Sequence, residues 1–186
     1  AMRYLVGYLA GIGCSKIALF GLHRDTIGDM SKLGGFAAGI RDNGLTFSGE
    51  DIYSRGLIAD CAERLLSNIS RYQAVMCTSD LIAVYLVKYL DDHGIRVPED
   101  IFVTGFGNWL TVDNYDPSIT RMRTDLFELG VQSVKHYIHM QNNPQTLHSS
   151  AVISCSLQIG KSTANLSAAK LLHTGTAPAV NSESSA

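Results

Sequence analysis

Residues 74–106 read AVMCTSDLIAVYLVKYLDDHGIRVPEDIFVTGF, and they contain two apolar strands with a helix between them. The first strand, AVMCTS, is short and apolar, as is typical of a buried strand. Asp80 is well placed to cap a helix over residues 81–93, which Gly94 ends. The turn VPED then leads into a second apolar strand at residues 101–106. This order predicts parallel strands joined by a right-handed crossover.

The same alternation precedes this block. Residues 17–22, IALFGL, form a short apolar strand, and residues 29–41 follow as a helix that the turn DNG ends. Residues 57–69 carry an apolar stripe at helical spacing. Three glycines lie inside the first of these helices: Gly34, Gly35 and Gly39. Because each costs about 1 kcal/mol relative to alanine in a helix, we expect them to allow a close helix-to-sheet contact.

The pattern changes near residue 117. Residues 124–141 form a helix with apolar positions, and residues 151–159 form a last strand. Residues 165–186 are rich in Ser, Thr, Ala and Gly, so we expect a weakly ordered tail. We predict an α/β fold for residues 1–164, with a Rossmann-like parallel sheet and flanking helices.

Composition excludes several classes of protein. The chain has 186 residues, is 46% hydrophobic and 17% charged, and carries a formal net charge of −2. No cluster of Lys and Arg is visible, so the chain itself is not expected to grip nucleic acid. No apolar run approaches the ~18 residues that a membrane span needs, which predicts no membrane partner. The four cysteines are scattered in apolar surroundings, as buried free thiols of a reducing cytosol would be.

Catalytic motifs are also missing from the sequence. It contains no GxSxG, HExxH or Walker loop, and the GIG at residues 11–13 precedes a strand instead of following one. His136 and His139 lie three residues apart on a helix, without a third ligand nearby. We therefore predict neither an enzyme nor a bound metal or cofactor.

Polar residues follow the predicted strands at the edge where an open parallel sheet binds ligands. This edge holds Ser79 and Asp80 after one strand, and Gly107, Asn108 and Trp109 after the next. Tyr53 lies at the end of a further short strand. Hydroxyl-bonding groups mixed with aromatic rings suit a sugar, although Asp80 as a cap and Trp109 as a core residue are structural alternatives.

The chain resembles the lactose/galactose repressor (LacI/GalR) family over residues 2–164. YLAGIGCSKIALFG at residues 8–21 looks like the family's helix, glycine turn and strand, and KLGGFAAGI at residues 32–40 looks like its next helix. Residues 74–106 match its most diagnostic block, and DPSITRM at residues 116–122 resembles its proline-x-leucine-threonine-threonine crossover. The resemblance implies a type I periplasmic-binding-protein-like fold, truncated mainly to the C-terminal lobe.

In that family, a DNA-binding headpiece precedes two lobes that clamp a small effector. The resemblance implies that this chain starts at the second lobe, and that the helix at 124–141 belongs to the otherwise missing first lobe. Operator DNA would then be bound only through a headpiece that lies outside this chain. The function implied is effector sensing by a cytoplasmic bacterial transcriptional regulator, with a mono- or disaccharide as the effector.

Four site residues are implied by position in the family pattern. Lys32 stands where the family commonly has a sugar-binding arginine. A lysine at this position lacks the two parallel N–H donors by which arginine forms bidentate hydrogen bonds. Tyr53 falls where relatives place an aromatic that stacks on the effector. Ser79 replaces an asparagine ahead of Asp80. Gly107 replaces an aspartate that often binds effector hydroxyls, and this GFG resembles the sucrose- and trehalose-type branches, which favours a disaccharide.

The helix that starts at residue 81 is apolar almost all round, so one sheet face cannot cover it. In the family, this helix and the loop near residue 115 form a two-fold dimer interface. We therefore expect a homodimer, with the interface residues Val84, Tyr85, Lys88 and Tyr115. Two alternatives to a regulator remain: a solute-binding protein of a sugar transporter, which shares the architecture, and an α/β enzyme.

Overall fold

The computed structural model describes residues 1–23, 26–54, 56–107, 118–143 and 152–164. In these ranges, six strands form one sheet in the order β2-β1-β3-β4-β5-β6. The strands are β1 (Ile17–Phe20), β2 (Ile52–Tyr53), β3 (Ala74–Cys77), β4 (Phe102–Phe106), β5 (Thr120–Thr124) and β6 (Cys155–Gln158). The first five in spatial order pair in parallel, and β6 pairs antiparallel to β5.

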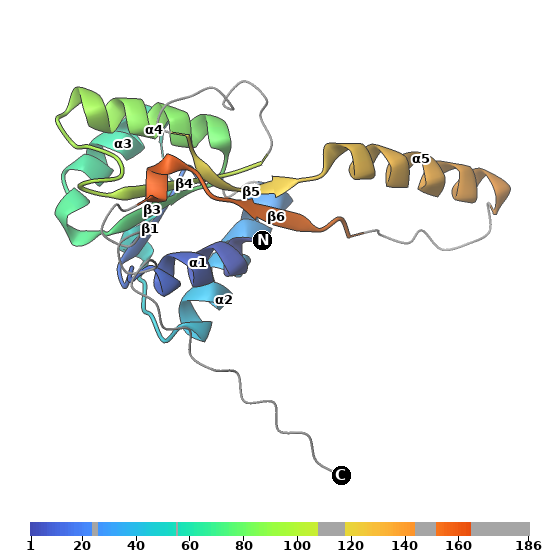
Figure 1. Ribbon diagram of the computed structural model, residues 1–186, viewed down its shortest axis with the longest axis horizontal. Helices are drawn as coiled ribbons and strands as arrows, with labels where there is room; N and C mark the ends of the chain where they lie inside the picture. Colours follow the sequence, from blue (N-terminus) through green and yellow to red (C-terminus); the bar gives the residue numbers. More distant parts are fainter. Residues whose placement is uncertain (24–25, 55, 108–117, 144–151, 165–186) are drawn as a thin grey trace, which may run out of the picture.

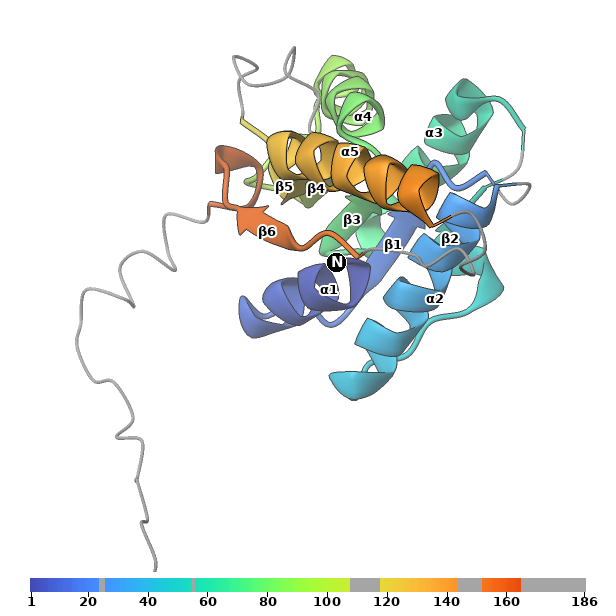
Figure 2. The same ribbon diagram turned by 90° about the vertical axis from the view of Figure 1, so that its right-hand side faces the viewer.

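Helices cover both faces of this sheet, as Figure 1 and Figure 2 show. These helices are α1 (Met2–Gly11), α2 (Ile27–Asp42), α3 (Ile58–Leu66) and α4 (Asp80–Asp92), and a fifth helix, α5 (Leu126–Asn142), lies outside the two faces. One apolar cluster joins α1 and α2 to the sheet, and a second joins α3 and α4 to the opposite face. The predicted α/β class is confirmed, with buried four-residue strands at β1 and β3. No helix in the described ranges is long and apolar enough to cross a membrane.

The glycines of α2 have a different purpose from the one expected. A Cβ added at Gly39 would lie 2.7 Å from the Cβ of Val6 and 2.9 Å from the carbonyl oxygen of Arg3. Both neighbours belong to α1, not to the sheet. At Gly34, by contrast, an added Cβ would meet nothing within 4 Å. The close approach is therefore between two helices, and it is allowed by Gly39 together with Gly35, where an added Cβ would lie 3.0 Å from the Cβ of Met2.

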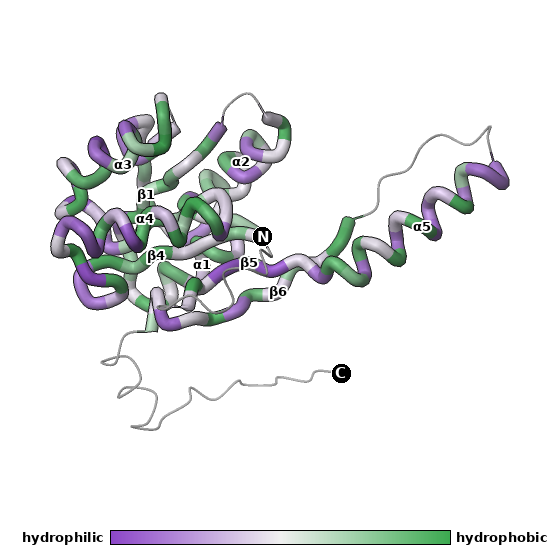
Figure 3. Tube along the Cα trace, turned by 90° about the horizontal axis from the view of Figure 1, so that it is seen from above, coloured by the Kyte–Doolittle hydropathy of each residue, from purple (hydrophilic) through white to green (hydrophobic). Residues whose placement is uncertain are grey.

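Helix α5 stands apart from this three-layer body. It begins just after the carboxyl end of β5 and extends away from the sheet, with hydrophobic positions along its length (Figure 1, Figure 3). None of its side chains with a described burial is buried, and Phe127 is 81% exposed. The predicted helix at 124–141 thus exists as α5, but it contributes nothing to the core of the described chain. The predicted tail at 165–186 lies outside the described residues.

Candidate functional site

A crevice is expected at the carboxyl edge of the sheet, between β1 and β3. These strands are neighbours, but the helices that follow them pack on opposite faces, α2 on one and α4 on the other. Such a switch point separates the two loops and leaves space between them for a ligand. The strand ends are tied together below this point, because the Thr78 hydroxyl donates to the Gly21 carbonyl oxygen at 2.6 Å.

Lys32 lies at this edge, and its ammonium group has two fixed neighbours. Its Nζ donates to Oδ1 of Asp29 at 2.8 Å, and it lies 5.2 Å from the centre of the Phe106 ring. The first neighbour is one turn back on α2, whereas the second ends β4. The contact with Phe106 therefore brings α2 to the end of a strand two places away in the sheet.

Asp29 is itself held firmly. Thr26 caps α2 by accepting a hydrogen bond from the Asp29 backbone N–H, and the Asp29 carboxylate accepts one from the His23 backbone N–H at 2.8 Å. Burial alone would raise the pKa of Asp29, but the hydrogen bonds from Lys32 and His23 outweigh it and hold the pKa below its ordinary value. At neutral pH the carboxylate is therefore charged beside the Lys32 ammonium.

The start of α4 differs from the sequence-based expectation. Ser79, not Asp80, is the N-cap, and its hydroxyl oxygen accepts a hydrogen bond from the Ile82 N–H at 3.2 Å. Asp80 is the first helical residue, and its carboxylate lies 3.3 Å from the Arg121 guanidinium. The side chains of this ion pair are 0% and 2% exposed, so Asp80 points into the body. A buried charge needs a partner, and Arg121 provides it.

Tyr53 is also in the interior. The residue is 4% exposed and packs in the core cluster on the α3–α4 face of the sheet. Its hydroxyl lies 3.1 Å from that of Tyr72, which donates to Asp51 at 3.0 Å. A ring enclosed in this way does not offer a stacking face, so the expected stacking role for Tyr53 does not fit its position. The physical reason is the alternation of the strand: Ile52 points to the opposite, α1–α2 face.

Gly107 directly follows β4 at the carboxyl edge of the sheet, with a φ of 121° that residues other than glycine rarely adopt. Its N–H donates to the Met122 carbonyl oxygen at 2.9 Å, which fixes the loop against β5. The other expected site residues after β4, Asn108 and Trp109, lie outside the described residues, as does Tyr115. The structure thus brings Lys32 to the end of β4, beside Gly107, and turns Asp80 and Tyr53 away.

Three residues of importance were missed by the sequence reasoning. Asp29 is three residues before Lys32 on a helix, a spacing that places opposite charges side by side and could have revealed the pair. Arg121, inside β5, stands where the crossover motif has its second threonine, and this replacement of a small residue by a large cation was a usable signal. Phe106 carried no signal of its own, because an aromatic at a strand end is usual in a core.

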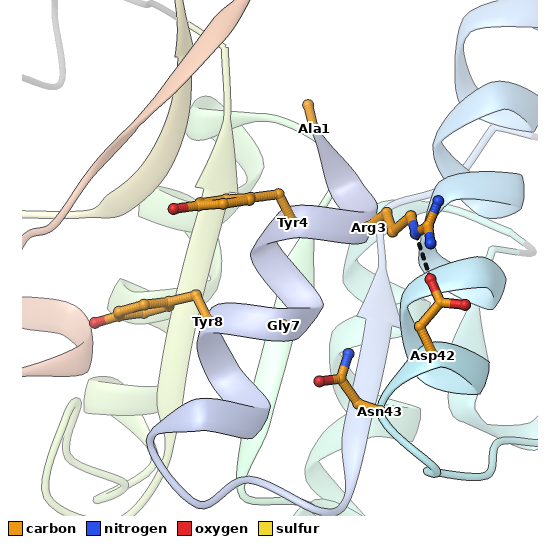
Figure 4. A pocket seen from close by; sticks show the side chains of 7 residues that line it. All are labelled: Ala1, Arg3, Tyr4, Gly7, Tyr8, Asp42 and Asn43. Carbon is orange, nitrogen blue, oxygen red and sulfur yellow. Dashed lines mark hydrogen bonds and ion pairs between the residues drawn. The ribbon is translucent and has the colours of Figure 1, made fainter. Parts of the chain in front are cut away.

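A separate open hollow lies beside α1 (Figure 4). Its volume is about 680 Å³, and its lining is Ala1, Arg3, Tyr4, Gly7, Tyr8, Asp42 and Asn43. The guanidinium of Arg3 is bound by the Asp42 carboxylate, and the Tyr8 hydroxyl lies 2.8 Å from that of Thr163. Figure 4 shows the two tyrosines on one side of α1 and the ion pair on the other. The polar groups therefore do not converge on one point, as a built ligand site would require.

The described ranges give little evidence for metal binding or for a nucleophilic cysteine. No group of three His, Cys, Asp or Glu side chains there could hold a metal ion. The four cysteines all lie in described segments and are free thiols, three of them buried. Burial raises the pKa of Cys14 to about 11, and burial followed by the charge of Asp80 raises the pKa of Cys77 further. Neither sulfur is a ready nucleophile at neutral pH.

Comparison with known proteins identifies the family of this chain. The model of the periplasmic binding protein-like domain family matches residues 6–163. The chain belongs to this family. The HTH-type transcriptional repressor PurR of Vibrio vulnificus is 27% identical over 143 residues, which is 71% of this chain and 43% of that repressor. This chain therefore spans less than half the length of the curated relatives that it matches.

Solved structures agree on the fold. A LacI-type transcription regulator from Bifidobacterium animalis superposes with a TM-score of 0.78 at 22% identity, covering 88% of this chain and 64% of the other. The regulator CelR in complex with cellobiose gives 0.78 at 20% identity, covering 87% and 50%. These structures confirm the fold, and the family model together with the PurR likeness identifies the chain as a LacI/GalR-type effector-binding domain, as the resemblance implied. The relatives are transcriptional repressors, so the alternative of a transporter's solute-binding protein is not favoured.

Proposed function

We propose that this domain supplies one half of a saccharide-binding cleft in a cytoplasmic LacI-type repressor, and that a mono- or disaccharide is the effector. The observation that carries this proposal is the arrangement of Lys32, Asp29 and Phe106 at the switch point of the sheet. A held ammonium donates to hydroxyls in a fixed direction, and a neighbouring ring offers apolar contact to a sugar's C–H face. Gly107, Asn108 and Trp109 extend the proposed site after β4, and Ser79 borders it at the cap of α4.

The second half of the cleft is proposed to come from the first lobe of the longer repressor. Helix α5 leaves the carboxyl edge and exposes Phe127, Val134 and Ile138, which a lobe packed there would cover. Burying such side chains is worth about 1.5–3 kcal/mol each. Operator DNA would be bound by a headpiece on the same longer protein, since this chain carries a net charge of −2 and its sequence has no cluster of Lys and Arg.

The homodimer is proposed to form through α4. Leu81 is 53% exposed, and Val84 and Tyr85 are only partly buried, although all three lie on one helical face with Lys88. An apolar strip flanked by a charge suits an isologous two-fold contact. Tyr115, the fourth proposed interface residue, would join it from the loop after β4.

The proposal is tested by calorimetric titration of the full-length regulator with mono- and disaccharides, cellobiose and trehalose among them. Lys32→Ala should weaken binding by about 1–3 kcal/mol, since a hydrogen bond to a charged group is lost. Lys16→Ala is the matched control, because it removes the same charge from the exposed loop before β1, at the other edge of the sheet. Equal affinities for the parent and both variants would remove Lys32 from the site. Absence of binding to every saccharide would refute the sugar proposal itself.

A further inference from the structure

The charge of the proposed site is already balanced without an effector. The Lys32 ammonium is 2.8 Å from the Asp29 carboxylate, and the side chains of the pair are 24% and 11% exposed. A second hydrogen bond, from the His23 N–H, fixes the carboxylate so that it cannot swing away from the cation. An anionic ligand that approached Lys32 would therefore meet a fixed negative charge within one helical turn.

In the described ranges, the two arginines of β5 do not change that balance. Arg121 is buried against Asp80. Arg123 lies two residues further along β5, and the residue between them, Met122, packs in the cluster on the α1–α2 face. Because side chains alternate along a strand, Arg123 points to the α3–α4 face, on the opposite side of the sheet from Lys32. Among the described residues, the other neighbour of the ammonium is the Phe106 ring, which is uncharged, and His23 interacts electrostatically with Asp29.

From this geometry we infer that the effector is an uncharged saccharide and that Asp29 makes the site reject phosphorylated or carboxylated sugars. The inference rests on the proposed function and narrows its ligand class. Lys32 keeps an N–H that can donate to a hydroxyl, so a neutral sugar is accepted with the ion pair intact. A sugar phosphate would have to compete with Asp29 for the same cation, and the like charges repel. Asp29 acts as a specificity residue through Lys32.

The test uses matched ligand pairs that differ by one phosphate: glucose and glucose 6-phosphate, trehalose and trehalose 6-phosphate, cellobiose and cellobiose 6-phosphate. Calorimetry with the full-length regulator measures the affinity ratio within each pair. For the pair that binds, the parent should prefer the neutral sugar by roughly tenfold or more, and Asp29→Asn should lower that preference about tenfold. Asp29→Asn should also gain affinity for inorganic phosphate. Asn keeps an oxygen for the His23 N–H, so the loop geometry is preserved.

Asp42→Asn is the matched control, because it removes the same charge from the far end of α2, where Asp42 pairs with Arg3. Its affinity ratio should equal that of the parent. A parent that prefers the phosphorylated sugar overturns the inference and leaves the proposed saccharide function standing. An unchanged ratio in Asp29→Asn overturns the role of Asp29. Failure of the parent to bind any member of any pair refutes the proposed function, and the inference with it.

Discussion

Gly39→Ala should loosen the packing of α2, the helix that carries Lys32, against α1. An added Cβ would lie 2.7 Å from the Cβ of Val6 and 2.9 Å from the Arg3 carbonyl oxygen, and a backbone atom cannot rotate out of the way. The helices must separate, and overpacking of this kind costs typically about 1–3 kcal/mol. Alanine also gains about 1 kcal/mol of helix propensity over glycine. The net loss in free energy of unfolding should therefore be up to about 2 kcal/mol.

Gly34→Ala isolates the propensity gain in the same helix. Gly34 is exposed, and an added Cβ would touch nothing within 4 Å, so this variant should gain up to about 1 kcal/mol. Urea unfolding of parent and both variants, followed by circular dichroism, measures the two changes with opposite expected signs. If the two variants shift the unfolding midpoint equally and in the same direction, α1 and α2 are not in the contact described, and the reasoning fails.

Three further outcomes are expected. Val84→Asp should favour monomers of the full-length regulator in sedimentation, because an unpaired charge in an apolar interface costs several kcal/mol; a dimer of unchanged affinity would argue against α4 as the interface. Cys155, the one partly exposed thiol of the four, should react first with a thiol reagent at neutral pH and give a fast phase of modification. The variant Cys155→Ser should lose this fast phase, and a fast phase that persists would contradict the burial of the other three thiols. The pKa of Asp29 is lowered in the fold, so its stabilisation is full above its ordinary value of 3.8 and is lost as pH falls through the folded value. The gap in unfolding free energy between parent and Asp29→Asn should therefore close in acid, and a gap that is constant between pH 7 and 3 would refute this.

The strands that are apolar throughout could be predicted from the sequence. The strands that mix apolar with polar or charged residues could not. Strands β1 and β3 are buried along their whole length, so a short apolar run identified them. Strand β5, with the sequence TRMRT, was not predicted. Arginine is almost never fully buried, and its presence argues against a central strand until a partner is known. That partner is Asp80, which is 41 residues away in the chain and is brought close only by the crossover.

The edge of the sheet that carries the proposed site could be predicted, but not the direction of the side chains there. Strand order alone indicates a crevice at the carboxyl edge, and Lys32 lies there. Tyr53 and Asp80 follow strands at the same edge, yet both side chains are directed inward. Tyr53 closes a hydrogen-bonded chain with Tyr72 and Asp51, and Asp80 neutralises Arg121. Polar groups that are available to a ligand and polar groups that already have a hydrogen-bond or ion-pair partner in the protein both occur at strand ends. A pattern of residue types therefore cannot distinguish the two.

The direction of α5 links the proposed effector site to the proposed contact with the first lobe. Strand β5, which leads to α5, is held to the body through the segment after β6 by buried polar contacts. The Thr120 N–H donates to the Ser162 hydroxyl at 2.9 Å, and that hydroxyl donates to the Val103 carbonyl oxygen at 2.6 Å. The base of α5 is therefore fixed, and it lies beyond the same carboxyl edge at which Lys32 and Phe106 meet. A lobe that packs on the exposed side chains of α5 must lie next to this edge. Under the proposed function, covering α5 and enclosing the effector would be one structural event, and we expect a change at Lys32 to alter how tightly the two lobes close.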